Sequence, residues 1–284
     1  MPEIKIAFWN VGNLFDTTAS ELATDLEFTP EQGWTPAAYD AKVKNLASVI
    51  NALHDSTGPD LLGLCEVENE SVIRDLIKAT GRSDLQIAHI DSEDLRGIDC
   101  TLLYSDKLFR KPAKSEMKGH TVHLRYATRD IFEVRLRLKG SGTPPELIVL
   151  VNHWPSRKNG QYETEPLRIT AAEHTGRLVD AYLKYSKQEY LTAKPPFTLD
   201  QLKARWNRNV LLMGDFNDGP GIDEFEKLFG HSGIEILLGT GPDPATRLTD
   251  PHAALADGAP IAVAGTDSNV LSVSTYARTS AGGA

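Results

Sequence analysis

Four short apolar runs that each end abruptly in a polar residue are the feature that most constrains the fold of this chain. The polar residues that end them are Asn10, Glu66, His153 and Asp215. The runs alternate with segments whose apolar residues recur at helical spacing, as at residues 37–53. This alternation predicts an α/β protein whose sheets are covered by helices. Ligands in such proteins gather where strand ends deliver polar groups, so we expect the functional site at these four ends.

The pattern of strands and helices continues to about residue 230. The sequence predicts strands at residues 4–9, 61–65, 85–90, 100–104, 131–138, 147–151 and 210–213, and helices at residues 37–53, 70–80, 167–190 and 222–229. Neither an internal repeat nor a linker divides the chain, so we predict one domain over residues 1–284. Within it, residues 242–284 form an atypical tail rich in Ala, Gly, Thr and Pro, a composition that indicates disorder or a frameshift.

Composition narrows the class of protein. The formal net charge is −9. Proteins that hold long nucleic acid usually present a broad basic surface, so we do not expect tight DNA binding by the whole surface. The chain has neither an apolar run of about 18 residues nor a basic and then apolar N-terminal segment. We therefore expect no membrane span and a cytoplasmic location, and we expect a monomer. Cys65 and Cys100 lie in apolar runs and are expected to be buried free thiols.

The polar residues at the strand ends suit the hydrolysis of a phosphate ester. This reaction needs charge neutralisation on the phosphoryl oxygens, an oriented water and help for the leaving oxygen. Glu66 is a hard oxygen ligand of the kind that Mg²⁺ prefers. Asp215 is suited to orient or deprotonate the water, and Asn217 to hold a phosphoryl oxygen through its amide. Asn10 is suited to complete the metal shell or to position Asp215. His153, partly protonated near neutral pH, is expected to donate a hydrogen bond or a proton to the phosphate.

Each of these residues alone also has an ordinary structural explanation. An Asn after a strand is a common turn residue. Glu66 could cap a helix, and a single His after a strand is more often structural than catalytic. Their joint occurrence at successive strand ends is what favours the catalytic interpretation.

Five short segments, residues 9–15, 66–69, 96–99, 152–157 and 214–218, carry the polar motifs. In this order they resemble the endonuclease/exonuclease/phosphatase superfamily, whose fold is DNase I-like. The resemblance covers about residues 4–230. It implies a four-layer α/β sandwich, in which two packed β-sheets are flanked by helices. It also implies that Glu66 binds the metal together with Asp215, that His153 contacts the phosphate, and that Asp215 and Asn217 form a catalytic pair. Asn10 matches the asparagine that ends the first strand.

Residues beside these positions complete the predicted site. Arg96 and Arg157 are expected to contact substrate phosphates, with solvated surface arginines as the equally weighted alternative. Asn13 is assigned to substrate binding. Asp99 is expected either to orient His153 or to make a buried structural hydrogen bond. The implied cofactor is Mg²⁺, with Mn²⁺ as the alternative.

The sequence departs from the superfamily at its C-terminal end. The family closes with a Ser-Asp-His triplet after a strand, but this chain contains no Asp-His dipeptide. Residues 269–274 resemble the penultimate strand, and the last strand is expected to be missing. Three explanations stay open: a truncated or frameshifted product, a segment left out of the given sequence, or a divergent member that rebuilds the site.

We therefore predict a divalent-metal-dependent hydrolase of phosphodiester bonds, a nuclease or phosphodiesterase in which water attacks in line. The negative net charge favours a short nucleic acid or a small phosphodiester as substrate. One alternative is a catalytically impaired relative that binds phosphate ligands or a partner. The other is a phosphomonoesterase or a phospholipid-headgroup hydrolase.

Overall fold

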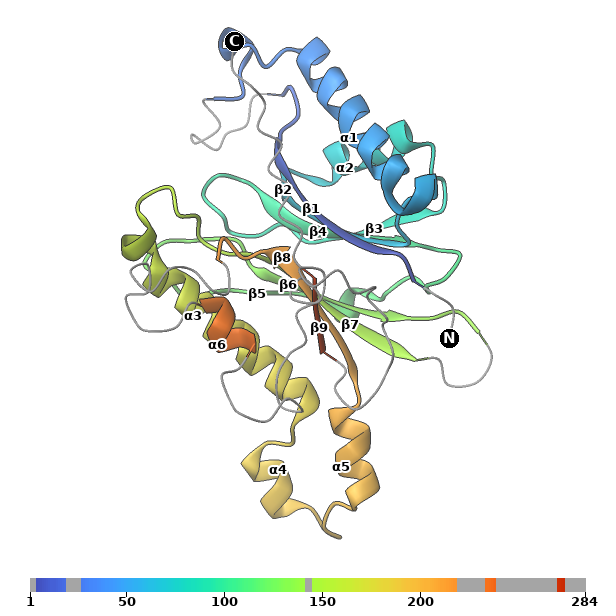
Figure 1. Ribbon diagram of the computed structural model, residues 1–284, viewed down its shortest axis with the longest axis vertical. Coiled ribbons are helices and arrows are strands. Elements are labelled where there is room, and N and C mark those ends of the chain that lie inside the picture. Colours follow the sequence, from blue (N-terminus) through green and yellow to red (C-terminus); the bar gives the residue numbers. More distant parts are fainter. Residues whose placement is uncertain (1–3, 19–26, 141–144, 219–232, 239–269, 274–284) are drawn as a thin grey trace.

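Two mixed β-sheets form the framework of the protein (Figure 1). The structure, a computed structural model, describes residues 4–18, 27–140, 145–218, 233–238 and 270–273. The first sheet, in spatial order, consists of β1 (Ile6–Leu14), β2 (Leu61–Val67), β4 (Asp99–Ser105) and β3 (Leu85–His89). The second consists of β5 (Met117–His120), β6 (Ile131–Arg137), β7 (Glu146–His153), β8 (Asn209–Asp215) and β9 (Val270–Val273).

Two parallel strand pairs decide which residues meet at the sheet edge. β1 runs parallel to β2, and β7 runs parallel to β8. Parallel strands finish at the same edge of a sheet. Asn10 is therefore paired with Cys65, the residue before Glu66, and His153 is paired with Asp215. Glu66, His153 and Asp215 thus lie at or next to the ends of their strands, and Asn10 lies level with the end of β2.

Helices cover the outer faces of both sheets, and this arrangement is the predicted four-layer α/β sandwich (Figure 1). The first sheet carries α1 (Pro36–Ser56) and α2 (Glu70–Thr80), and the second carries α3 (Gln161–Leu183) and α6 (Gly233–Leu238). Two short helices, α4 (Lys187–Thr192) and α5 (Leu199–Trp206), project beyond the end of α3. The 3₁₀ turns η1 (Pro30–Gln32) and η2 (Lys114–Glu116) complete the described elements. No helix in the described part of the chain combines the length and apolarity needed to cross a membrane.

Strand alternation fills three apolar layers, one between the sheets and one under the helices on each side. On β7, Val149 and Val151 belong to the layer between the sheets, whereas Ile148 and Leu150 pack in the layer that contains α3. Successive side chains of a strand point to opposite faces, so a strand covered on both faces is apolar at every position. This explains the continuous apolar runs in the sequence. Cys65 on β2 lies opposite Cys100 on β4 in the strand register. Both are buried free thiols, as predicted.

Most predicted elements are confirmed, with shifts at their ends. β1 continues past Asn10 to Leu14. The helix predicted over residues 167–190 is wrong in extent, because Lys184 is extended and Ser186 caps the separate helix α4. The sequence carries no clear signal for β5, α5 or α6. The helix predicted at residues 222–229 lies outside the described residues, as does the tail from 242 onward apart from β9, which forms within the strand expected at residues 269–274.

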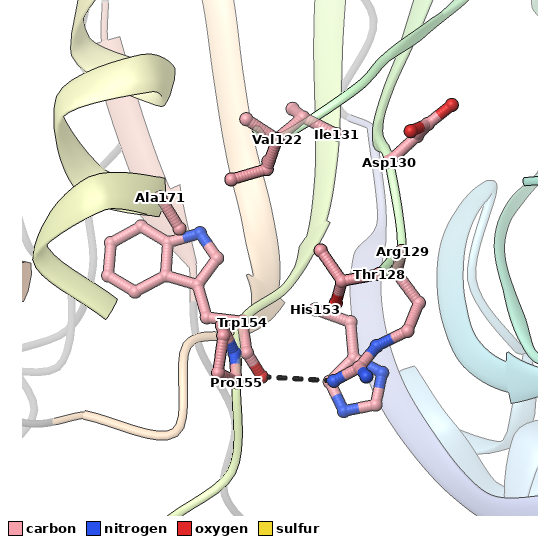
Figure 2. Close-up of a pocket in the computed structure, with 9 residues that line it drawn as sticks. All are labelled: Val122, Thr128, Arg129, Asp130, Ile131, His153, Trp154, Pro155 and Ala171. Atoms are coloured by element: carbon pink, nitrogen blue, oxygen red, sulfur yellow. Dashed lines mark hydrogen bonds between the residues drawn. The ribbon is translucent and has the colours of Figure 1, made fainter. Parts of the chain in front are cut away.

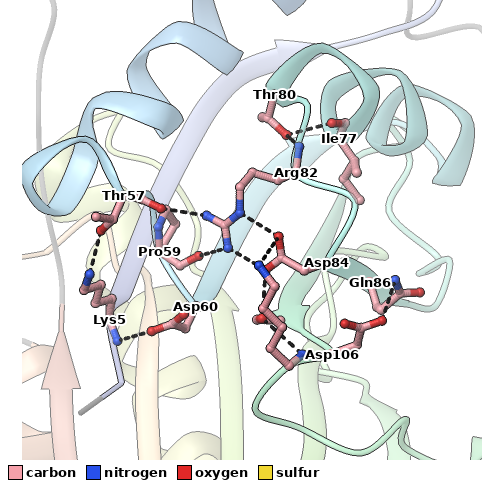
Figure 3. Close-up of polar contacts among 12 residues, drawn as sticks. Lys5, Thr57, Pro59, Asp60, Ile77, Thr80, Arg82, Asp84, Gln86 and Asp106 are labelled. Carbon is pink, nitrogen blue, oxygen red and sulfur yellow. Dashed lines mark hydrogen bonds and ion pairs between the residues drawn. The ribbon is translucent and has the colours of Figure 1, made fainter. Parts of the chain in front are cut away.

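A polar network ties together the end of the first sheet that is remote from the predicted site (Figure 3). Arg82 donates two hydrogen bonds of 2.8 Å to Asp84 and two longer ones to the carbonyl oxygens of Thr57 and Pro59. Ser105 also donates to Asp84, at 2.8 Å. The Arg82 guanidinium holds the pKa of the Asp84 carboxyl well below its usual range. The network therefore links the end of α1, the start of β3 and the end of β4.

Gly214 lies where β7 and β8 approach too closely for a side chain. A Cβ at this position would lie against the carbonyl oxygen of Asn152 and 2.7 Å from its Cβ. We expect Gly214→Ala to lower the free energy of unfolding by about 1–3 kcal/mol, because backbone cannot move aside cheaply. Chemical denaturation measures this. The matched control is Gly176→Ala in α3, where a Cβ meets nothing within 4 Å and the change should be neutral or stabilising. Equal effects of the two substitutions would contradict the prediction.

Candidate functional site

Asn10 joins the two sheets at the predicted site. Its side-chain Nδ2 donates to Glu66 Oε1 at 3.1 Å and to Asp215 Oδ2 at 2.9 Å. Its Oδ1 accepts a hydrogen bond of 2.9 Å from the backbone N–H of Gly12, which fixes the orientation of the amide. One amide therefore holds two carboxylates that are far apart in the sequence, and it does so from the middle of β1.

The direction of Glu66 is set by an irregularity in β2. The register of β2 shifts between Cys65 and Val67 against β4, and Glu66 between them has a φ of 62°. A left-handed conformation is uncommon for a residue other than glycine and occurs preferentially at functional sites. A bulge of this kind re-aims a side chain relative to the regular alternation of the strand. Glu66 accordingly points to Asn10 and His153 instead of following the pleat.

Asp215 is held through both carboxylate oxygens. Oδ2 accepts from Asn10, and Oδ1 accepts from the backbone N–H of Asn217 at 3.0 Å. Asn217 has a φ of 48°, which turns the chain sharply after β8. Its Nδ2 donates to the carbonyl oxygen of Trp154 at 2.9 Å. An amide nitrogen carries a second N–H. Asn217 therefore ties β8 to the end of β7, and this is a structural role in addition to the predicted contact with a phosphoryl oxygen.

His153 lies next to Glu66, with 3.6 Å between Nε2 and Glu66 Oε1. Burial lowers the pKa of His153 well below its ordinary value, and the nearby guanidinium groups of Arg129 and Arg96 lower it further. This direction favours the neutral imidazole in the free protein, whereas the sequence predicts partial protonation near neutral pH. The sequence shows the ionisable group but not its burial. A neutral imidazole still has one N–H to donate and one nitrogen to accept.

A small cavity lies behind the His153 ring (Figure 2). Its volume is about 10 Å³, the size that a single water needs. Six buried side-chain atoms in the described part of the chain have no hydrogen-bond partner. Four of them belong to residues that line this cavity: His153 Nδ1, Thr128 Oγ1, Arg129 Nε and Asp130 Oδ1. Arg129 also donates to the carbonyl oxygen of Trp154 at 3.3 Å, which places its guanidinium beside the histidine. The cavity lining thus combines these polar groups with apolar side chains such as Val122 and Ile131.

The lowered pKa of His153 predicts that stability falls in mild acid. The unfolded chain binds a proton near pH 6.5, while the folded protein resists protonation, so the unfolded state holds more protons below that pH. The contribution is complete above pH 6.5 and is lost as the pH falls, by up to about 1.4 kcal/mol per pH unit. Denaturation of wild type and His153→Gln between pH 5 and 8, in the presence of a chelator, measures it. Identical pH slopes for the two proteins would refute the assignment.

The predicted substrate-binding residues Arg96, Asn13 and Arg157 come together around this centre. Arg96 donates to Asn13 Oδ1 at 2.6 Å, and Asn13 has a φ of 59°. Arg157 donates from Nε to the carbonyl oxygen of Asn217 at 2.7 Å. Both guanidinium groups line the same cleft as Asn10 and are held at its edge. Both arginines are exposed, and Arg157 also lies 3.6 Å from Asp218, so the predicted phosphate contact and the alternative of a surface arginine both stay open.

Asp99 does not orient His153 in the described structure. It accepts a hydrogen bond of 2.8 Å from the backbone N–H of Ser92, and its other oxygen lies 3.7 Å from His89 Nε2. Burial raises the pKa of Asp99 to about 6. The predicted alternative, a buried structural hydrogen bond, matches the contact with Ser92. Asp99 makes it at the start of β4, next to the edge strand β3. His89, Asp91 and Asp99 place three metal-ligating atoms within 4.8 Å of one another. His89 shares a hydrogen bond of 3.1 Å with Asp91, and its contact with Asp99 is 3.7 Å.

Lys42 and Arg129 also contribute to the site, and the sequence gives no motif for either. Lys42 on α1 donates to the carbonyl oxygens of Gly12 and Asn13, the latter at 3.1 Å. Burial lowers the pKa of Lys42, and the negative charge of Glu66 opposes this shift. The only available signal for Lys42 is its place on the polar side of the helix predicted over residues 37–53. Arg129 lies in the loop before β6, where sequence periodicity is silent.

A cleft of about 1440 Å³ opens over these residues. Its walls combine polar, basic and aromatic side chains. Besides the predicted site residues they include Trp9, Phe15, Phe28, Tyr126, Arg129 and Lys158. The protein thus belongs to the class of two-sheet α/β sandwiches with a polar cleft at the strand ends. In this cleft the carboxylates of Glu66 and Asp215, the imidazole of His153 and the amides of Asn10 and Asn217 meet.

The sequence pattern of the Endonuclease/Exonuclease/phosphatase family matches residues 5–194, which is more than half of the chain. The chain belongs to this family. No curated protein matches the sequence.

The chain is similar to several solved structures at low sequence identity. The mannosyl-6-phosphatase of Bacteroides thetaiotaomicron is 13% identical, with 83% of this chain and 70% of that chain covered and a TM-score of 0.46. TDP2 from Caenorhabditis elegans is 15% identical, with 79% and 49% covered and a TM-score of 0.42. The human Nocturnin catalytic domain with bound sulfate is 16% identical, with 68% and 63% covered and a TM-score of 0.39. The chain therefore spans about half the length of TDP2.

Proposed function

We propose that this chain hydrolyses phosphodiester bonds in a reaction that depends on a divalent cation, Mg²⁺ or Mn²⁺. The observation that carries the proposal is the bridge from Asn10 to both Glu66 and Asp215. It brings together, from three strands and two sheets, the groups that the hydrolysis of a phosphate ester needs. His153 and Asn217 complete the constellation on the side of the second sheet.

The two carboxylates fit a divalent cation. Glu66 and Asp215 share one amide donor, so their oxygens are close together. Among the described residues, no Lys or Arg forms an ion pair with either one, and the His153 imidazole lies 3.6 Å from Glu66. Two neighbouring carboxylates that no cationic side chain pairs with directly supply the hard, anionic oxygens that Mg²⁺ and Mn²⁺ prefer. When bound, such a cation polarises a phosphoryl oxygen and neutralises charge.

The chain's own residues supply the remaining functions. Asp215 aligns the attacking water and accepts its proton as the bond to the leaving oxygen breaks, and the leaving oxygen takes up a proton from solvent. Asn10 keeps the Asp215 carboxylate in place through Oδ2. His153 donates its imidazole N–H to a phosphoryl oxygen as a neutral group, with Glu66 beside it. Arg96 and Arg157 at the edge of the cleft hold flanking phosphates, for which a guanidinium fork is well shaped.

The size of the cleft favours a substrate longer than a single nucleotide. At about 1440 Å³ it exceeds the roughly 300–1,000 Å³ of typical small-molecule pockets. Its basic residues lie beside aromatic ones, a combination that suits phosphates flanked by bases. The net charge of −9 argues against long duplex DNA. We therefore propose a short oligonucleotide or a comparable phosphodiester, acted on by a monomer.

The proposal is tested by the turnover of a short single-stranded oligonucleotide and of a generic chromogenic phosphodiester. Each is incubated with Mg²⁺, Mn²⁺, Ca²⁺ or a chelator. We expect turnover with Mg²⁺ or Mn²⁺ and none with the chelator. A wild-type protein that is folded but inactive with every cation would overturn the proposal. A chromogenic phosphomonoester in the same panel separates a phosphatase from a phosphodiesterase.

Replacing Glu66 tests the cation site directly. We expect Glu66→Gln to raise the cation concentration needed for half-maximal activity about 100-fold or more, because the variant loses an anionic ligand but keeps the shape. The binding of Mn²⁺, measured by electron paramagnetic resonance without substrate, should weaken in parallel. Glu70→Gln is the control, since Glu70 is half exposed on α2 and pairs only locally with Arg74. Unchanged Mn²⁺ binding by Glu66→Gln would contradict this role for Glu66.

A second function, phosphate binding without turnover, is favoured by one specific observation. The sequence contains no Asp-His dipeptide, which the family pattern places in the catalytic centre. Calorimetry of wild type with an oligonucleotide separates the two functions. A binder gives a saturable heat and unchanged ligand, whereas an enzyme gives continuing heat and shortened products.

A further inference from the structure

The segment between α3 and β8 forms a helical hairpin that projects from the lower end of the molecule (Figure 1). We call residues 184–208, which include α4 and α5, the α4–α5 hairpin. Two contacts lie within it: the Tyr185 ring stacks on Phe197 at 3.9 Å, and the Arg205 guanidinium lies 5.1 Å from the centre of the Tyr185 ring. Arg205 also donates to the carbonyl oxygen of Ala181 and so ties the hairpin to α3. Because these contacts hold the hairpin together, its outer surface is available for another role.

The outer surface of the α4–α5 hairpin is unusually apolar. Four of the eight exposed large hydrophobic residues in the described part of the chain belong to it: Tyr190 (59% exposed), Leu191 (66%), Leu199 (61%) and Trp206 (54%). On α5, Leu199, Leu202 and Trp206 follow the spacing i, i+3, i+7 of an amphipathic stripe. Such a stripe normally faces a protein core, but here its two ends are more than half exposed.

The same hairpin is basic, although the protein as a whole is acidic. It contains six Lys and Arg but only two Asp and Glu, against a net charge of −9 for the chain. Lys187, Lys194 and Lys203 are exposed beside the apolar residues. The acidic remainder of the chain is repelled by an anionic surface, so attraction to such a surface depends on this element.

We propose that the α4–α5 hairpin docks the protein on a membrane surface that contains anionic lipids. Segments that anchor proteins at a membrane interface combine Tyr, Trp and Leu, which insert at the level of the headgroups, with Lys, which contacts the lipid phosphates. The hairpin has this composition. A second copy of the chain is a poorer occupant, because a twofold contact would place each basic hairpin against another. Nucleic acid is also a poorer occupant, because exposed Leu191 and Leu199 have no counterpart on a phosphate backbone.

Docking by the hairpin leaves the cleft open to the aqueous side. β8 begins at Asn209, directly after the hairpin, and ends at Asp215 in the candidate site. A strand of seven residues spans roughly 20 Å, so the two lie at opposite ends of the sheet. The hairpin therefore recruits the protein to a membrane and does not present a lipid headgroup to the cleft. The inference is independent of the proposed hydrolysis.

Co-sedimentation of the full chain with vesicles tests the inference. We expect binding to phosphatidylcholine vesicles that contain phosphatidylserine, little binding to phosphatidylcholine alone, and release at high salt. The variants Leu199→Ser/Trp206→Ser and Lys203→Glu should each weaken the binding about tenfold or more. The matched controls on α1, Val49→Ser and Lys44→Glu, replace exposed residues outside the hairpin and should bind as wild type. Circular dichroism checks that every variant is folded.

Tryptophan emission supplies a second readout at a known position. Trp206 is more than half exposed, so its emission should shift to shorter wavelength when anionic vesicles are added. The shift should disappear in Trp206→Phe, which keeps an apolar ring at the position. Wild type that stays in the supernatant with anionic vesicles would overturn the inference. Vesicle binding that the hairpin variants do not weaken, or hairpin-dependent binding of an oligonucleotide but not of vesicles, would also overturn it.

Discussion

Asp215→Asn is expected to reduce the turnover of a phosphodiester by about 1,000-fold or more while the protein stays folded. Asp215 receives hydrogen bonds on both oxygens, from Asn10 Nδ2 and from the backbone N–H of Asn217. An asparagine has the same shape but only one accepting oxygen. Its NH₂ group would face one of these two donors, and it could not accept the proton of the attacking water. Loss of a general base typically costs 10²–10⁴-fold in rate, and here the positioning is lost as well.

Single-turnover kinetics with saturating Mg²⁺ and substrate measure this loss. The matched control is Asp40→Asn on α1, which makes the same chemical change at an exposed position. The control should retain wild-type turnover. If Asp215→Asn kept more than about a tenth of the activity, the proposed role of Asp215 would be wrong. If Asp215→Asn and wild type both bound substrate without turnover, the second function, binding alone, would apply.

Arg82→Met is expected to lower the free energy of unfolding by about 3 kcal/mol at neutral pH. The side chains of Arg82 and Asp84 are 19% and 6% exposed. They are joined by two hydrogen bonds and form the centre of the network at the end of the first sheet that is remote from the site (Figure 3). Methionine fills a similar volume but leaves the Asp84 carboxylate buried beside Ser105 without its main partner. It also removes the donors to the carbonyl oxygens of Thr57 and Pro59. Removing one partner of a buried pair costs more than the pair contributes.

The stability that Arg82 contributes depends on pH. Because Arg82 holds the pKa of Asp84 below its unfolded value of about 3.9, the stabilisation is present above that pH and is lost as the pH falls. The difference between wild type and Arg82→Met should therefore shrink in strong acid. Urea denaturation at several pH values measures it. Arg74→Met, at an arginine that is 69% exposed on α2, should change stability by less than about 0.5 kcal/mol. Equal losses at Arg82 and Arg74 would show that the buried network contributes nothing special.

The strand ends of the site were predictable because burial and polarity change there abruptly. The apolar run of β2 is interrupted by Glu66, whose carboxylate cannot be buried in the core like the residues before it. The same argument applies to His153 at the end of β7 and Asp215 at the end of β8. The parallel pairing of β7 with β8 then brings these two residues into register. A local change in hydrophobicity is enough to identify such positions.

The surroundings of these residues were not predictable, since they depend on contacts between distant segments. The low pKa of His153 comes from burial and from Arg129, which belongs to a loop without any periodicity. The left-handed conformation of Glu66 depends on how β2 pairs with β4. The break between α3 and α4 at Lys184 was likewise hidden, because the apolar spacing of the helix continues in the sequence as far as Tyr190.

The sequence by itself determined the α/β class, the strand-end residues and the family motifs, because each depends on residues that are near one another along the chain. Only the tertiary structure decided that Asn10 meets both Glu66 and Asp215, since the two carboxylates stand on different sheets. It also decided that Asp99 turns to His89 and Ser92. Packing of the two sheets face to face sets these distances, and no local pattern in the sequence records the relative position of the sheets.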